Sequence, residues 1–294
     1  AANNASGMCC GTAQNSYHTL AGLRVILADG AMLDTEDEFS ITSFRQSHAA
    51  LLSELEQLGA ATRADEVLAA RIRHKFRIKN TTGYSLNALV DFEDPLDILA
   101  HLMIGSEGTL GFISRITYRT VVEDPCKASA LVFFATIEAA CQAVIRLKPG
   151  PVSAVELLDR PALRSVEGKP GLPPLIHTLS DDAAALLIEV RAETTTLLQQ
   201  RVDTALGALA GIPTIETPVF STDPETCAMY WKVRKGTFPS VGAMRRTGTT
   251  VIIEDVAFPI ESLAVATLDL QALLRKHGYT EGIIFGHALE GNLH

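Results

Sequence analysis

The stretch IGSEGTLGFISRITYR, residues 104–119, places glycines at positions 105, 108 and 111 between a helical pattern and a strand-like run. The dinucleotide fingerprint GxGxxG has the opposite order, because its phosphate lies at the N-terminus of the helix that follows a strand. Here the spacing is GxxGxxG. A glycine at every third residue lets the backbone approach a neighbour or a ligand closely. Spacing alone therefore leaves two interpretations open: a tight helix-to-strand connection, which is the commoner outcome, and a ligand cradle.

The residues before this turn predict one short hairpin and three helices. LRVILADGAML (23–33) is typical of a strand, and Asp29-Gly30 is a hairpin signal. FRQSHAALLSELEQLGA (44–60) has apolar residues at three- and four-residue steps, which predicts a helix that stops at Gly59. ADEVLAARIRHKFRI (64–78) predicts a second helix, KNTTGYSLNAL (79–89) a loop, and DPLDILAHLM (94–103) a third helix.

The residues beyond Glu123-Asp124-Pro125 follow a different rhythm, in which strands alternate with helices. The expected strands are ASALVFFA (128–135), AALLIEVRA (184–192), TTVIIEDVAFP (249–259) and EGIIFGHA (281–288). The expected helices lie between them, at residues 136–147, 193–211 and 260–278. This pattern predicts an open sheet covered by helices on one face. We therefore expect two domains, residues 1–124 and 125–294.

Composition indicates a globular protein and argues against nucleic-acid binding. The chain of 294 residues is 47% hydrophobic and 20% charged, and its net charge is −9. A nucleic-acid partner would require a basic face. The five cysteines form no CxxC pair and no metal-finger spacing, which favours a reducing compartment. We recognise no signal peptide, and the longest apolar run (128–145) contains Glu138 and is marginal in length for a membrane span.

Two further segments contain residue types that commonly take part in catalysis or ligand binding. MYWKVRKGTFPSVG (229–242) contains Arg234, and an arbitrary arginine is most often a surface charge. FGHALEGNLH (285–294) contains His287 and His294, whose spacing matches no zinc motif such as HExxH. Judged by spacing alone, core or surface histidines are the commoner outcome, and a metal site is the alternative.

Six segments together resemble one family of flavoproteins. They are NNASG (3–7), residues 11–30, residues 79–111, GSEGTLGFISRITYR (105–119), YWKVRKGTFPSVG (230–242) and IIFGHALEGNLH (283–294). In this order they are similar to the vanillyl-alcohol-oxidase or PCMH type of FAD-linked oxidoreductase, in the branch of D-lactate, D-2-hydroxyglutarate and glycolate dehydrogenases. The likeness is strongest to the large bacterial form with a C-terminal iron–sulfur portion, whose cysteine motifs do not occur here.

The resemblance implies an α+β fold. It comprises the C-terminal half of a PCMH-type FAD-binding domain, followed by a ferredoxin-like cap, or substrate, domain with an antiparallel sheet. The chain would be a fragment, because the first half of the FAD domain would precede residue 1. The FAD-binding residues implied are Asn4, Ala5, Ser6, Gly7, Gly105, Glu107, Gly108, Thr109, Gly111 and Ile113. Tyr84 is a candidate wall of the flavin pocket, although a buried tyrosine without a ligand contact is commoner.

The resemblance also assigns roles at the substrate site. Arg234 would clamp the substrate carboxylate, and Asn292 would help to hold the substrate. His287 and His294 would ligate a divalent metal, with zinc favoured, while the third ligand and the catalytic base would lie beyond residue 294. Leu289-Glu290 stand where the commoner pattern GHxGDGNLH has Gly-Asp. The lysine that clamps a second carboxylate in some relatives is absent at Ile253-Glu254, and Arg245 or Arg246 is the candidate substitute.

The reaction implied is oxidation of a D-2-hydroxy acid to the 2-oxo acid by hydride transfer to FAD. The alternatives are glycolate or another alcohol as substrate, or a catalytically silent fragment. A zinc hydrolase that uses His287, His294 and Glu290 is a weaker rival, because nothing else supports it. The electron acceptor would be the iron–sulfur portion or a respiratory carrier. We expect a cytoplasmic location, with peripheral attachment to the inner face of the membrane as the alternative, and no transmembrane segment.

Overall fold

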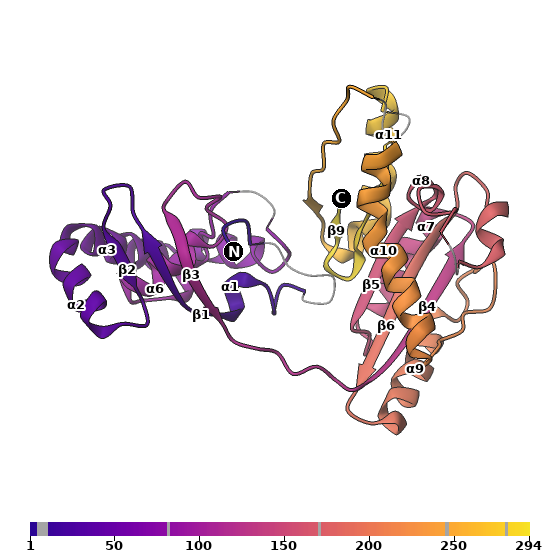
Figure 1. Ribbon diagram of the computed structural model, residues 1–294, viewed down its shortest axis with the longest axis horizontal. Coiled ribbons are helices and arrows are strands. Elements are labelled where there is room, and N and C mark those ends of the chain that lie inside the picture. The colour runs from indigo at the N-terminus through magenta and orange to yellow at the C-terminus, as the bar shows by residue number, and fades with distance from the viewer. Residues whose placement is uncertain (5–10, 81–82, 170–171, 245–246, 280–281) are drawn as a thin grey trace. The chain divides into compact units, whose positions relative to one another are not determined.

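The computed structural model describes residues 1–4, 11–80, 83–169, 172–244, 247–279 and 282–294. The chain divides into two compact units, Ala1–Val122 and Glu123–His294, which are coloured from indigo to magenta and from magenta to yellow (Figure 1). Each unit has its own sheet and its own apolar core. Each can therefore be described by itself.

The first unit contains a three-stranded antiparallel sheet of order β2-β1-β3. Its strands are β1 (Leu20–Ile26), β2 (Met32–Asp34) and β3 (Phe112–Tyr118). The predicted β1–β2 hairpin is confirmed. Its turn contains Gly30 at φ 86°, and the side chain of Asp29 accepts a hydrogen bond from the Ala31 N–H at 2.9 Å. This is the local turn chemistry that makes Asp-Gly a hairpin signal.

Six helices accompany this sheet in the described residues of the first unit: α1 (Ser16–Thr19), α2 (Glu38–Ser47), α3 (Ala49–Ala64), α4 (Glu66–Lys75), α5 (Ala88–Asp91) and α6 (Pro95–Met103). The predicted helix stop at Gly59 is wrong. The helical run breaks at His48 instead, and α3 continues through Gly59 to Ala64. A Cβ at Gly59 would lie 3.0 Å from Ile98 of α6, so this glycine allows two helices to pack closely.

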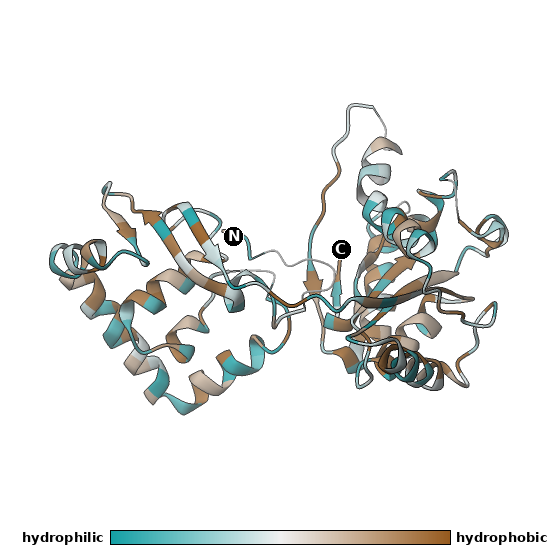
Figure 2. Cartoon of the chain, turned by 60° about the horizontal axis from the view of Figure 1, so that its bottom comes forward, coloured by the Kyte–Doolittle hydropathy of each residue, from teal (hydrophilic) through white to brown (hydrophobic). Residues whose placement is uncertain are grey.

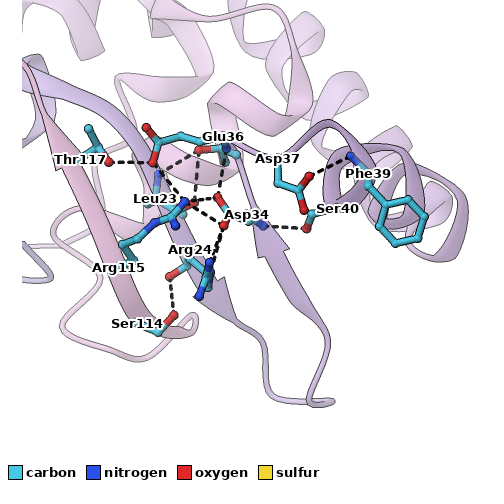
Figure 3. Close-up of polar contacts among 11 residues, drawn as sticks. Leu23, Arg24, Asp34, Glu36, Asp37, Phe39, Ser40, Ser114, Arg115 and Thr117 are labelled. Atoms are coloured by element: carbon cyan, nitrogen blue, oxygen red, sulfur yellow. Dashed lines mark hydrogen bonds and ion pairs between the residues drawn. The ribbon is translucent and has the colours of Figure 1, made fainter.

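A buried carboxylate ties the three strands of the first unit together (Figure 3). Asp34 accepts from Arg24 Nε at 3.0 Å, from Arg115 Nη2 at 2.8 Å and from the Glu36 N–H at 3.1 Å. Burial of Asp34 acts to raise its pKa, but these hydrogen bonds and the two guanidinium charges hold the pKa below its ordinary value. Thr117 of β3 donates to Glu36 at 2.7 Å and extends the same network.

The second unit is built on a six-stranded sheet of order β4-β6-β5-β8-β9-β7, in which every pairing is antiparallel. The strands are β4 (Cys126–Phe134), β5 (Ala154–Asp159), β6 (Ala184–Ala192), β7 (Val256–Ala257), β8 (Phe285–His287) and β9 (Asn292–Leu293). This mixed α+β architecture confirms the expected fold class. The run 249–259, predicted to be one long strand, forms only the two-residue β7 in the sheet, where it pairs with the equally short β9.

Helices cover both faces of this sheet, so the prediction of a single covered face is wrong. The helices are α7 (Ile137–Leu147), α8 (Arg160–Arg164), α9 (Thr195–Leu209), α10 (Pro224–Met244) and α11 (Leu263–Lys276), with 3₁₀ turns η1 (Pro174–Thr178), η2 (Ile260–Ser262) and η3 (Ala288–Glu290). α7, α9 and α11 share one apolar cluster with Val155 and Leu157 on one face of the sheet; α7 and α9 pack on its strands and α11 packs on α7. α8 and α10 lie on the opposite face, over Leu158 and Glu156 (Figure 1).

Burial on both faces explains the composition of the central strands. All six residues of β5 are buried, as are eight of the nine residues of β6. These strands are largely brown in Figure 2, the colour of hydrophobic residues. A strand buried on both sides reads as a continuous apolar run without alternation, so its period cannot reveal how many faces are covered. Within the described ranges, no helix combines the length and the apolar character that crossing a bilayer requires.

Candidate active site

Glu156 is the centre of a buried polar cluster in the second unit. It lies on β5 and its side chain is fully buried. Arg234 of α10 donates from Nε at 2.9 Å and lies with Nη2 at 2.7 Å from the same oxygen, Oε2. His287 of β8 places Nδ1 2.8 Å from Oε1 and 3.1 Å from Oε2. One carboxylate thus contacts the predicted substrate arginine and one predicted metal ligand.

The β8–β9 hairpin brings the two histidines together. Residues His287 and Asn292 are register partners, and the backbone of Phe285 exchanges two hydrogen bonds with His294. The rings of His287 and His294 consequently lie 5.1 Å apart, nearly perpendicular at 87°. Gly291 closes the hairpin at φ 62°. A Cβ on it would fall 2.0 Å from the carbonyl oxygen of Phe258, so only glycine fits this position.

Each histidine is held by a carboxylate through the same ring nitrogen. Nδ1 of His287 faces Glu156, and Nδ1 of His294 faces Asp255. When Nδ1 carries the proton, the lone pair of Nε2 is available to a metal ion or a ligand. Carboxylates behind the imidazoles are the usual arrangement at metal sites, since they fix the tautomer and make the ligand more basic. The donor set therefore fits two imidazole ligands of a divalent ion, although the described residues contain no group of three candidate ligands.

The residues Leu289-Glu290, which depart from the commoner motif, face away from the two imidazoles. Lys148, at the end of α7, donates from Nζ to the Leu289 carbonyl at 2.6 Å and pairs with Glu290 at 3.3 Å. Leu289 packs against the core on the α7 side of the sheet. The acids that contact the imidazoles are Glu156 and Asp255, so the geometry gives no support to Glu290 as their partner in a hydrolase.

Asn292 and Arg234 make further contacts around this cluster. The Asn292 side chain is fully buried and donates to the carbonyl of Val256 at 3.1 Å, which ties β9 to β7. The Arg234 guanidinium carbon lies 4.8 Å from the ring centroid of Phe285, within the range of a cation–π contact. The ring of Phe285 in turn lies 5.3 Å from that of His294. Arg245 and Arg246, the candidates for a second clamp, lie outside the described residues.

In the first unit, the structure brings two of the predicted FAD segments side by side. The N–H of Glu107, in the glycine turn, donates to the carbonyl of Ala2 at 2.9 Å. A Cβ on Gly105 would lie 3.8 Å from that of Asn4. The side chain of Asn4 accepts from the N–H of Tyr17 at 3.1 Å. Ala5, Ser6 and Gly7, the other predicted residues of this segment, lie outside the described residues.

The backbone of the glycine turn adopts conformations that favour glycine. Gly105, Glu107 and Gly108 all have positive φ, at 91°, 53° and 77°. A Cβ on Gly108 would meet nothing within 4 Å, so its conformation, and not a crowded neighbour, accounts for the glycine. The N–H groups of Ser106, Glu107 and Thr109 donate to the carbonyls of Met103, Ala2 and Ser106. What the turn offers a ligand is therefore close approach to a backbone without side chains at its glycines. These features fit a flavin nucleotide.

The remaining predicted FAD residues lie around this turn. Thr109 shares a 2.9 Å hydrogen bond with the hydroxyl of Tyr84. Tyr84 is 43% exposed, so the commoner alternative of a buried tyrosine is wrong, and its place in a flavin pocket stays a prediction. Gly111 passes close to β1, because a Cβ there would lie 2.8 Å from Val25. Ile113 is on β3, an edge strand of the three-stranded sheet.

Glu156 and Asp255 are the site residues that motif spacing did not reveal. Glu156 lies 131 positions before His287 in the chain, and Asp255 lies 39 positions before His294. A single acid within the apolar run SAVELL (153–158) was an available signal for Glu156, since a buried charge requires a partner. For Asp255 we find no comparable local signal.

Comparison with known proteins places the chain among flavin-dependent oxidases. Residues 124–294 match the family model described as FAD linked oxidases, C-terminal domain. Similar curated proteins include glycolate oxidase subunit GlcD of Bacillus subtilis, with 28% identity over 67% of this chain and 40% of the relative. Another is the mitochondrial cytochrome-type D-lactate dehydrogenase of Arabidopsis thaliana, with 29% identity over 67% of this chain and 33% of the relative.

A third curated relative covers more of this chain. The D-2-hydroxyglutarate dehydrogenase of Haemophilus influenzae is 24% identical over 96% of this chain and 29% of the relative. The chain thus spans 40% or less of the length of each of these three relatives. The substrates in their names are those of the relatives.

Solved structures support the fold. An alkyldihydroxyacetonephosphate synthase aligns over 99% of this chain and 48% of its own, with a TM-score of 0.58 and 12% identity. The 4-ethylphenol oxidase of Gulosibacter chungangensis aligns over 97% and 52%, with a TM-score of 0.53 and 11% identity. These likenesses concern architecture alone. The family match over more than half of the chain is decisive, and this protein belongs to the FAD linked oxidases, with residues 124–294 matching their C-terminal domain.

Proposed function

We propose that the protein takes part in FAD-dependent oxidation of a D-2-hydroxy acid of the D-lactate or D-2-hydroxyglutarate class to the 2-oxo acid. The observation that carries this proposal is the gathering of Arg234, His287 and His294 on one face of the sheet. A hydroxy acid presents a carboxylate and a neighbouring hydroxyl, which need a cation and a polarising group at short range. The curated relatives named above support the class of substrate.

Arg234 would orient the carboxylate. In the described residues Glu156 is its only hydrogen-bond acceptor, and that contact uses Nε and one N–H of Nη2. The outer edge of the guanidinium, formed by Nη1 and the second N–H of Nη2, can therefore donate two parallel bonds to a substrate carboxylate. Held in this way, the Cα hydrogen would be directed at one face of the cofactor.

His287 and His294 would hold a divalent metal through Nε2, with water completing the two-histidine set within this chain. Such an ion lowers the pKa of a coordinated hydroxyl, which makes its proton easier to remove. Bound FAD supplies the acceptor for the hydride. In the first unit, Asn4 and the turn from Gly105 to Gly111 would hold the nucleotide. We propose that the electrons then pass to an iron–sulfur portion or a respiratory carrier, in a cytoplasmic protein.

The test is anaerobic bleaching of flavin absorbance after FAD has been added and the protein desalted. D-lactate, D-2-hydroxyglutarate and glycolate are compared, and the L-enantiomers of the first two serve as stereochemical controls. Arg234→Lys keeps the charge but loses the planar fork. We expect this variant to lower the second-order rate of bleaching by about 100-fold, equivalent to about 3 kcal/mol.

Lys235→Met is the matched control, because Lys235 is the exposed neighbour of Arg234 on the same helix. We expect it to bleach at nearly the wild-type rate. A flavin-loaded protein that none of the three acids bleaches would contradict the proposal. Equal rates in the two variants would remove Arg234 from its proposed role.

A further inference from the structure

Arg234 and His287, the proposed substrate-binding and metal-binding residues, contact the same carboxylate, that of Glu156. Oε2 of Glu156 accepts from Arg234, and both oxygens lie within hydrogen-bond distance of His287 Nδ1. We propose that Glu156 is a positioning residue that fixes the Arg234 fork and the Nδ1–H tautomer of His287 together. This inference rests on the proposed function, because the arginine and the histidine acquire their roles there.

The fold makes Glu156 rigid and leaves its two partners few alternatives. β5 lies between β6 and β8 in the sheet, and Glu156 is the direct register partner of His287. Arg234 contacts Glu156 from α10, which packs on the face of the sheet that carries Glu156. The Glu156 side chain is fully buried and that of Arg234 is 6% exposed. Water therefore has little access with which to replace the ion pair.

Only an ionised carboxylate satisfies both donors. It has acceptor sites on two oxygens and no proton to donate. A glutamine in the same place would offer one acceptor oxygen and one NH₂ group. If the NH₂ faced His287, the ring would have to accept at Nδ1 and carry its proton on Nε2, where the metal would bind. If it faced Arg234, two donors would oppose each other.

The same sheet face provides a matched control. Glu189, on the adjacent strand β6, is also an almost completely buried acid. Its carboxylate accepts from Trp231 Nε1, from Arg191 Nε and, at 3.4 Å, from Ser129 Oγ. None of these donors belongs to the proposed site. Glu189→Gln therefore removes a buried acid under α10 whose partners named here differ from those of Glu156.

The experiment reads the tautomer of His287 directly, by long-range ¹H–¹⁵N correlation NMR of the imidazole rings without metal or flavin. His287→Gln assigns the signals. In the wild-type protein at pH 8 we expect the proton on Nδ1. In Glu156→Gln we expect it to move wholly or partly to Nε2, and in Glu189→Gln to stay on Nδ1. A wild-type ring protonated on Nε2 would overturn the proposal without any variant.

Metal affinity gives a second readout, with Zn²⁺ alone as the probe in isothermal titration. Loss of a carboxylate behind a metal-binding histidine lowers affinity by about 10- to 100-fold. We expect that loss in Glu156→Gln and less than about a twofold change in Glu189→Gln. Equal behaviour of the two variants in both measurements would refute the positioning role. Neither measurement uses FAD or a hydroxy acid, so a correct tautomer in a protein that oxidises no hydroxy acid would refute the proposed function alone.

Discussion

Replacing Gly291 with alanine is the most direct test of the geometry that holds the site. The residue closes the β8–β9 hairpin at φ 62°, and a Cβ on it would lie 2.0 Å from the carbonyl oxygen of Phe258. Ordinary contacts of this kind are longer than 3.4 Å. The carbonyl of Phe258 belongs to the backbone, so it cannot avoid the clash by rotating as a side chain would. Relief therefore requires that β7 and β9 separate by more than an ångström.

The cost has two parts. An alanine in the left-handed region is less stable than glycine by about 1 kcal/mol. Separation of the strands also weakens the 3.0 Å hydrogen bond from the Phe258 N–H to the Gly291 carbonyl, and the Val256–Leu293 pairing beside it. Each such bond contributes about 1 kcal/mol. We expect Gly291→Ala to lower the free energy of unfolding by about 2–4 kcal/mol.

Gly207→Ala is the matched control with the opposite expected sign. Gly207 is an exposed residue of α9, and a Cβ there would meet nothing within 4 Å. Alanine is the better helix former, so this variant should gain up to about 1 kcal/mol. Urea unfolding followed by tryptophan fluorescence reports both, because Trp231 is the only tryptophan and lies in α10 of the same unit. A Gly291→Ala protein within about 0.5 kcal/mol of wild type would refute the hairpin geometry.

Two carboxylates give further predictions, both checked by denaturant unfolding across a range of pH. Asp34→Asn should destabilise the first unit by about 2 kcal/mol at pH 7, as seen by circular dichroism. The pKa of Asp34 is lower in the folded state than in the unfolded state, where it is about 4. The stability that its carboxylate contributes is therefore present above about pH 4 and lost as pH falls through the folded pKa. In acid, the variant should be as stable as wild type. Burial raises the pKa of Asp159 to about 7, so the stability that its protonated form contributes is present below about pH 4 and lost as pH rises to 7. The two carboxylate oxygens accept from the N–H groups of Ala162 and Ile284 at 2.8 Å each, and an amide offers only one acceptor oxygen, so Asp159→Asn should be less stable than wild type at pH 4. This deficit should shrink as pH rises to 8, because wild type alone loses stability over that range; the same difference at both pH values would contradict the assignment.

The sequence allowed the local features of the fold to be predicted. The Asp29-Gly30 hairpin is encoded by two neighbouring residues, and the turn confirms it. Gly59 shows where local reasoning fails. A glycine ends many helices, yet here it lies inside α3, where the absence of a Cβ lets Ile98 of α6 approach. The decisive partner lies 39 positions away, beyond the reach of any helix-stop rule.

The predicted length of the strand at residues 249–259 was wrong for a related reason. The apolar run 249–259 has strand composition, but a strand is only as long as the partner that pairs with it, and β9 offers two residues to β7. Ile252 is 80% exposed and Ile253 is 43% exposed in the described structure. Composition therefore predicted the presence of β7 and could not predict its length.

The site residues that sequence reasoning missed share one property: each is an acid whose partners lie far away in the chain. On α10, Trp231 and Arg234 are three positions apart and face the same way. Trp231 donates to Glu189 of β6 and Arg234 donates to Glu156 of β5, so one helix contacts two buried acids on adjacent strands. The position of α10 over the sheet is consequently set in part by polar contacts, which a hydrophobic pattern cannot predict. Both acids anchor the helix, but only Glu156 contacts the substrate arginine, so loss of Glu156, and not of Glu189, should uncouple the arginine from the histidine beside it.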